Sequence, residues 1–244
     1  MPRCFISPGE LEQTVCRLDS GDAHHLINVL RLRDGDQVTA CDGAGRAAAA
    51  HLRIAGRKQA SLERTGEIQS VPRFLPLIYI CVAVPKGARM DLLIEKCTEL
   101  GVHAIQPLII QRSVAMKNES AKESRIVRWQ RIAQAAAAQS GRAWLPQLLP
   151  PASLAQTIAD TRQLDLRLCA ALLPQAEEIR NTLQRSSRTP QSICIWIGPE
   201  GDFTAEEYKQ IFDSGIMPVN LGPHTMRVET AAIAATAICA ACRQ

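Results

Sequence analysis

Short apolar runs separated by turn-forming residues characterise the first 72 residues of the chain. The predicted strands are 5–6, 15–18, 37–41, 47–54 and 60–67. Asp42-Gly43 lies between two of these runs, and an Asp-Gly pair in that position is typical of a β-hairpin. One segment, 23–30, has helical spacing, and we expect Asp22 to be its N-cap. Because many short strands crowd into about seventy residues, the pattern predicts a small β-barrel over residues 1–72.

Residues 71–76 form a predicted linker with prolines at 72 and 76, and a different pattern begins at residue 77. Apolar runs now alternate with segments of helical spacing, and the run 77–84 is continuous, as in a strand buried on both faces. The predicted strands are 77–84, 104–110, 166–172, 192–197 and 219–221. The predicted helices are 90–100, 123–141, 177–185, one that starts at Thr204, and 228–242. This alternation predicts an α/β domain over residues 73–244, with a mainly parallel sheet between two layers of helices.

Two Gly-Pro loops follow the last two predicted strands. They are Gly198–Asp202 and Leu221–Thr230. Ligands of open parallel sheets bind outside the carboxyl ends of the strands, so we expect both loops to lie at the ends of neighbouring strands, with a third strand end at Leu172 beside them. Together they would offer backbone N–H and C=O groups to a flat ligand. Neither loop has the glycine spacing of a dinucleotide site or of a nucleoside triphosphate loop.

Two charged residues stand where the second loop meets the last predicted helix. Glu229 complements the positive end of the helix dipole, and it is either structural or a catalytic base. Arg227 opposes that dipole, so we expect it to serve something outside the helix, such as a phosphate or a base of the substrate.

The composition permits a nucleic-acid partner and does not require one. Hydrophobic residues make up 46% of the 244 residues, which is enough for a buried core, and the net charge is only +4. Residues 1–72 carry equal numbers of basic and acidic side chains, so the whole excess lies further along the chain. Arg31 and Arg33 lie close to Asp34, and they form either surface ion pairs or contacts to a phosphate backbone.

No feature of the sequence predicts a metal site, a membrane span or a signal peptide. His24 and His25 are adjacent and do not share a helix face, and Cys239-x-x-Cys242 has no second cysteine pair. The nine cysteines are scattered, and several lie in apolar runs, as reduced cysteines do. No uncharged apolar run reaches roughly 18 residues. We therefore expect a cytoplasmic protein without bound metal.

Several motifs spread over nearly the whole chain resemble the RsmE family of bacterial 16S rRNA uridine-N3 methyltransferases, in the SPOUT superfamily. These motifs are Arg3 and Phe5, His24–Arg31, Glu95–Val102, Gln139–Arg142, Gly198–Gly201 and Leu221–Ala231. The resemblance implies a PUA-like barrel that docks RNA, followed by an α/β domain whose C-terminal part forms a trefoil knot, an exception to the rule against knots. It also implies a homodimer that acts on a uridine of 16S rRNA in the 30S ribosomal subunit.

The resemblance also implies roles for individual residues. The cofactor would be S-adenosyl-L-methionine, held by Leu172, Gly198, Glu200, Gly201, Leu221, Gly222 and Met226. The catalytic candidates are Arg227, to stabilise the uracil anion, and Glu229, as a base or to orient Arg227. The RNA-contact candidates are Arg3, Arg31, Arg33 and Arg142.

Three positions depart from the family pattern. Asp202 stands where we expect a second glycine, His224 where arginine is commoner, and Ser140 where cysteine is frequent. The first two put the details of the cofactor loop in question. Two other functions stay open at this point: a ribose 2′-O-methyltransferase of the same superfamily, and a non-catalytic protein that binds rRNA during assembly.

Overall fold

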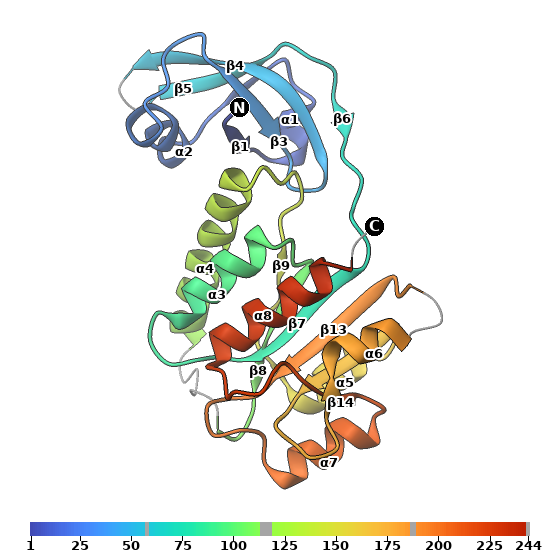
Figure 1. Ribbon diagram of the computed structural model, residues 1–244. Coiled ribbons are helices and arrows are strands. Elements are labelled where there is room, and N and C mark those ends of the chain that lie inside the picture. The colour runs from blue at the N-terminus through green and yellow to red at the C-terminus, as the bar shows by residue number, and fades with distance from the viewer. Residues whose placement is uncertain (57–58, 113–118, 186–188, 243–244) are drawn as a thin grey trace. The chain divides into compact units, whose positions relative to one another are not determined.

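The computed structural model describes residues 1–56, 59–112, 119–185 and 189–242, in two compact units (Figure 1). The first unit contains Met1–Arg73 and Gln134–Leu145, and the second contains Phe74–Ala133 and Pro146–Gln244. The sequence pattern did not predict that 134–145 would belong to the first unit. These residues belong there because Ala137 packs with Phe5 and its neighbours in a small buried cluster.

A six-stranded sheet forms the first unit. Its strands are β1 (Arg3–Phe5), β2 (Val15–Arg17), β3 (Gln37–Cys41), β4 (Arg46–Gly56), β5 (Gln59–Arg64) and β6 (Gln69–Ser70). The order is β1-β3-β4-β5-β2, and β6 pairs with β4. Only β1 and β3 run parallel among these pairs. Alternate side chains point into a core that includes Val38, Leu52 and Leu62, as expected of pleated strands with one buried face.

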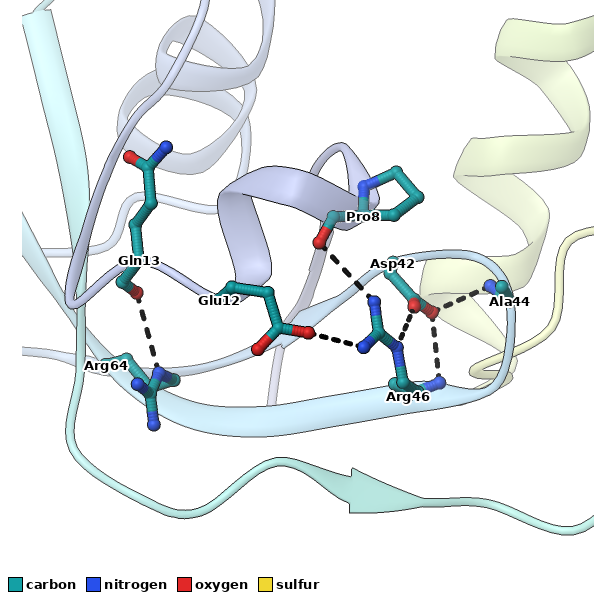
Figure 2. A network of polar contacts seen from close by, with 7 residues as sticks. All are labelled: Pro8, Glu12, Gln13, Asp42, Ala44, Arg46 and Arg64. Atoms are coloured by element: carbon teal, nitrogen blue, oxygen red, sulfur yellow. Dashed lines mark hydrogen bonds and ion pairs between the residues drawn. The ribbon is translucent and has the colours of Figure 1, made fainter.

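The Asp42-Gly43 hairpin signal is confirmed, because β3 and β4 pair antiparallel on either side of it. Oδ1 of Asp42 accepts hydrogen bonds from the backbone N–H groups of Ala44, at 2.8 Å, and Arg46, at 3.0 Å. The Arg46 guanidinium donates to Asp42 and to Glu12, so it ties the hairpin to the segment after α1 (Pro8–Leu11) (Figure 2). Gly43 has φ +73°, a left-handed conformation that glycine adopts without strain.

The helix predicted over 23–30 starts earlier and changes type, and its predicted cap is wrong. Helix α2 spans Ser20–His24 and continues as a π-helical turn, η1 (His25–Val29). The N-cap is Asp19, whose Oδ1 accepts from the N–H groups of Gly21 and Asp22, each at 2.7 Å. Asp22 instead lies in the first turn of α2, because Asp19, two residues after the end of β2, already caps the helix.

The second unit is built on an eight-stranded sheet whose pairs are all parallel. The strands are β7 (Leu77–Ala83), β8 (Ala104–Ile109), β9 (Gln147–Leu148), β10 (Ala152–Ser153), β11 (Leu166–Ala170), β12 (Glu177–Glu178), β13 (Ser192–Ile197) and β14 (Met217–Asn220). The order is β10-β8-β7-β13-β11-β14-β12, with β9 beside β8. The predicted mainly parallel sheet is therefore confirmed.

Helices cover both faces of this sheet. They are α3 (Arg89–Glu99), α4 (Glu119–Gln139), α5 (Leu154–Asp160), α6 (Ile179–Arg185), α7 (Ala205–Asp213) and α8 (Val228–Ala240). Ile78, Ile80 and Val82 of β7 pack with residues of α3, α4 and α8, and Figure 1 shows α3 and α8 side by side on this face. Cys81 and Ala83, which alternate with them, pack with residues of α5 and α7 on the other face. No helix of the described residues is long and apolar enough to cross a membrane.

The strand order sets the positions of the two Gly-Pro loops. Strand β11 lies between β13 and β14, so the loops follow strands that are not neighbours, contrary to the prediction. The third strand end, at Ala170, lies between them. The chain must cross β11 on its way from β13 to β14, and it then returns to pack α8 against β7 and β13.

Candidate active site

A pocket of about 270 Å³ lies in the second unit, where β11, β13 and β14 end. Its walls come from the three segments that follow these strands and from the start of α8. The lining residues are Ala170, Ala171, Leu172, Ile197, Gly198, Pro199, Glu200, Asp202, Leu221, Gly222, His224, Thr225, Met226, Val228 and Ala231. The pocket therefore stands at the carboxyl edge of the parallel sheet, where ligands of such folds bind.

The first loop is held in shape by close packing at Gly198. A Cβ atom at this position would lie 3.0 Å from Cδ2 of Phe203 and 3.3 Å from Oδ1 of Asp202. Phe203 is buried, so its ring has little room to retreat. Beyond the loop, Thr204 and Glu207 form a capping box, which fixes the start of α7.

The second loop turns sharply after β14. Oδ1 of Asn220 accepts a hydrogen bond of 2.8 Å from the N–H of Gly222. Gly222 has φ +147°, which side chains rarely allow. The loop ends at Arg227, the exposed N-cap of α8, which leaves the guanidinium near the surface while Val228 and Glu229 turn inward.

A residue that the sequence prediction missed, Arg89, joins the two loops. Its Nη1 donates to Oε1 of Glu200, in the first loop, at 2.7 Å. Its Nε lies 3.8 Å from Oε1 of Glu229, at the start of α8. Arg89 is the first residue of α3, and a cation there opposes the helix dipole in the same way as Arg227 does. A positive charge at the first position of a predicted helix was the sequence signal that could have identified Arg89.

Glu229 is a buried carboxylate whose charge faces Arg89. Its side chain is 8% exposed, and Oε2 has no hydrogen-bond partner among the residues that the structure describes. Glu229 and Arg227 are both absent from the pocket lining. A general base must reach the proton that it removes, directly or through one water. The position of Glu229 in this conformation favours a structural role over that of a base.

The structure brings most of the predicted cofactor residues together. Six of them line the pocket: Leu172, Gly198, Glu200, Leu221, Gly222 and Met226. Gly201 does not, and its carbonyl oxygen accepts a hydrogen bond from Arg112. The two unusual residues, Asp202 and His224, do line the pocket, so both of these departures from the family pattern lie at the site itself.

The four predicted RNA contacts lie in the first unit. Arg31 and Arg33 are exposed in the segment before β3. Arg3 is half-buried on β1, where its guanidinium lies 3.4 Å from Sγ of Cys41. Arg142 is half-buried just after α4. Trp144, two residues further on, donates to the carbonyl of Val71 at 2.9 Å and packs within the first unit.

The side chains that line the pocket suit a ligand that is partly flat and apolar and partly cationic. Leu172, Leu221 and Met226 supply apolar contact, and Asp202 supplies a negative charge, whereas the carboxylate of Glu200 is paired with Arg89. Among the described residues, no group of three or more His, Cys, Asp or Glu side chains is placed to hold a metal ion.

Two protein-family models match parts of the chain. A model described as an RNA methyltransferase domain matches residues 74–240, and one described as an RNA methyltransferase PUA domain matches residues 18–63. The ribosomal RNA small subunit methyltransferase E of Synechocystis is 33% identical over 239 residues, which cover 96% of this chain and 76% of the relative. The chain belongs to the RsmE family. The family member from Bacillus subtilis is 31% identical and covers 86% of this chain and 83% of its own length.

Solved structures of RsmE-like proteins share the fold over their whole length. The RsmE protein of Neisseria gonorrhoeae, solved with S-adenosyl methionine bound, has a TM-score of 0.85 at 30% identity and covers 97% of this chain and 95% of its own. A methyltransferase from Legionella pneumophila, solved with the same cofactor, has a TM-score of 0.87 at 30% identity and covers 98% and 96%. The family expected from the sequence motifs is thus confirmed.

Proposed function

We propose that this protein transfers a methyl group from S-adenosyl-L-methionine to N3 of a uridine in 16S rRNA. The observation that carries the proposal is the pocket at the ends of β11, β13 and β14, built by two Gly-Pro loops in a member of the RsmE family. The substrate would be the 30S ribosomal subunit in the cytoplasm. The enzyme would act as a homodimer, with residues 1–72 docking the RNA and residues 73–244 carrying the chemistry.

We propose that the cofactor is held by the loop residues that line the pocket. Its adenine ring would lie against Leu172, Leu221 and Met226, and the backbone of Gly198 and Gly222 would supply hydrogen-bonding groups. Gly201 would help indirectly, by keeping the first loop in place. When bound, the cofactor supplies a methyl group on a positively charged sulfur. A trefoil knot is supported by the path of the chain across β11 and back to α8, and it stays part of the proposal.

Arg227 is the residue that we propose for the uracil. The neutral imide nitrogen is a poor nucleophile, so N3 must lose its proton, which solvent water takes up, and the ring then carries negative charge on its oxygens. An exposed guanidinium can stabilise this charge by charge-assisted hydrogen bonds. Glu229 would act through Arg89, by fixing the start of α8 so that Arg227 is aimed correctly. Alignment of N3 with the methyl group would supply several kcal/mol of the rate enhancement.

The RNA would be docked by arginine side chains of the first unit. Arg3, Arg31, Arg33 and Arg142 all belong to it, although they come from segments far apart in the sequence. Contacts with phosphates release counterions, so binding to 30S subunits should weaken steeply as salt rises. Binding that does not depend on salt would contradict these contacts.

The proposal is tested by methyl incorporation. Purified protein and labelled S-adenosyl-L-methionine are incubated with 30S subunits from cells that lack the gene, and with free 16S rRNA as a comparison. We expect incorporation into 30S subunits, and a loss of at least about a hundredfold for Arg227→Ala, the scale for one lost charge-stabilising donor. Arg185→Ala, an exposed arginine of α6 with its own carboxylate partner, serves as the control and should keep full activity. Normal turnover of the Arg227 variant would remove the proposed role of that residue.

A further inference from the structure

Asp202 gives the pocket a side chain at a position where backbone geometry favours glycine. Its φ is +60°, and among the described residues other than glycine only Arg31 shares this feature. Oδ1 accepts a hydrogen bond of 2.9 Å from the N–H of Phe203 and one of 2.6 Å from the hydroxyl of Tyr208. The same oxygen lies 3.3 Å from the point where a Cβ of Gly198 would be. The carboxylate is therefore fixed at the pocket wall.

The N–H of Phe203 and the hydroxyl of Tyr208 orient the carboxylate of Asp202 but do not neutralise its charge. Burial raises the pKa of Tyr208 above its ordinary value, and the hydrogen bond and charge of Asp202 raise it further. The phenol thus stays neutral and serves only as a donor. The other carboxylate of the lining, Glu200, is paired with Arg89 at 2.7 Å. Among the described residues, no ion pair includes Asp202, so it is the carboxylate of the lining without a cationic partner, and His224 is the remaining titratable group of the lining.

We propose that the carboxylate of Asp202 attracts the positive charge of the bound methyl donor, so that the pocket binds this cationic cofactor more tightly than its neutral demethylated product. This inference rests on the proposed function. S-adenosyl-L-methionine carries one positive charge more than S-adenosyl-L-homocysteine, because methyl transfer leaves the sulfur as a neutral thioether. Asp202 is exposed to solvent, so its attraction for that charge is screened. The preference for the charged donor would weaken inhibition of the enzyme by S-adenosyl-L-homocysteine.

Calorimetry with the two ligands tests the proposal without any turnover. The quantity is the ratio of the Kd of S-adenosyl-L-homocysteine to the Kd of S-adenosyl-L-methionine. Asp202→Asn keeps an oxygen acceptor and a residue type that tolerates a left-handed backbone, and it removes only the charge. We expect the ratio to fall about fivefold in this variant, as for one screened charge at close range. In the wild type the ratio should also fall as salt is raised.

Tyr208→Phe is the matched control, because it removes the hydrogen bond and leaves the charge. Its ratio should equal that of the wild type, even if both ligands bind more weakly. Asp202→Gly, which removes strain and charge together, should match the Asn variant. An unchanged ratio in both Asp202 variants, or an equal fall in the Tyr208 variant, would overturn the inference and leave the proposed function standing. Failure of the wild type to bind either ligand would overturn both.

Discussion

Arg89→Ala would remove the side chain that connects the two loops of the pocket. Nη1 of Arg89 lies 2.7 Å from Glu200, and Nε lies 3.8 Å from Glu229. The two carboxylates differ in exposure: the Glu200 side chain is 41% exposed and that of Glu229 is 8% exposed. Glu200 would therefore be solvated after the substitution, whereas Glu229 would be left as a buried charge without a cation.

The cost follows from that difference in exposure. An exposed ion pair contributes about 0–1 kcal/mol, so the loss of the Glu200 contact is small. Loss of one partner of a fully buried pair costs about 3–5 kcal/mol. Arg89 is itself 37% exposed, and its contact with Glu229 is long, so water compensates part of this loss. We expect Arg89→Ala to lower the free energy of unfolding of the second unit by about 2 kcal/mol.

Urea unfolding in a double-mutant cycle isolates the contribution of Glu229. In the Glu229→Gln background Arg89 has no buried carboxylate as a partner, so the Arg89 substitution should cost less than about 1 kcal/mol. Arg89→Lys should recover part of the loss. Arg53→Ala, which breaks the exposed Arg53–Glu63 pair of the first unit, is the matched control and should have little effect. A coupling below about 0.5 kcal/mol between Arg89 and Glu229 would refute the reasoning.

Three further predictions concern packing and thiol chemistry. Gly198→Ala should weaken binding of S-adenosyl-L-methionine about tenfold or more in calorimetry, because the added Cβ would lie 3.0 Å from a buried ring; unchanged affinity would contradict this account of the loop. Gly45→Ala should destabilise the first unit by about 3 kcal/mol in urea, because its Cβ would lie 2.1 Å from Trp144 and its φ is +87°, and a stable variant would show that the indole can move away. A thiol reagent at neutral pH should modify only Cys242 rapidly, since the other eight cysteines are buried and burial raises the pKa of Cys97 to about 12. Colorimetry should then count one fast thiol in the native protein and nine in denaturant, and more than one fast native thiol would refute the burial.

Regular elements were predictable where a side-chain period was long enough to read. The strands Gln37–Cys41 and Ser192–Ile197 have the predicted bounds, because alternation or a continuous apolar run defines each of them. Four strands of two residues each, β6, β9, β10 and β12, were missed, since two residues carry no period. The cap of α2 was misplaced because Asp19 and Asp22 are both capping residue types, and only the fold selects between them.

The site was predictable as far as local sequence determines it. The Gly-Pro loops signalled a ligand pocket, and six of the seven residues predicted to bind the cofactor line one. Arg89 was missed because its contact with Glu200 spans 111 positions of the chain and exists only once α3 and β13 are packed in the same unit. The same limit applies to Asp202, whose place in the sequence showed only a departure from glycine, while the orientation of its carboxylate comes from a hydrogen bond with Tyr208, one turn into the next helix.

Nucleoside analysis of 16S rRNA tests the central claim most directly. Small-subunit rRNA from a strain that lacks the gene is digested and analysed by mass spectrometry before and after incubation of its 30S subunits with purified protein and S-adenosyl-L-methionine. The account predicts that 3-methyluridine is absent before incubation and present after it. A methyl group on ribose, or no new methylated nucleoside at all, would contradict it.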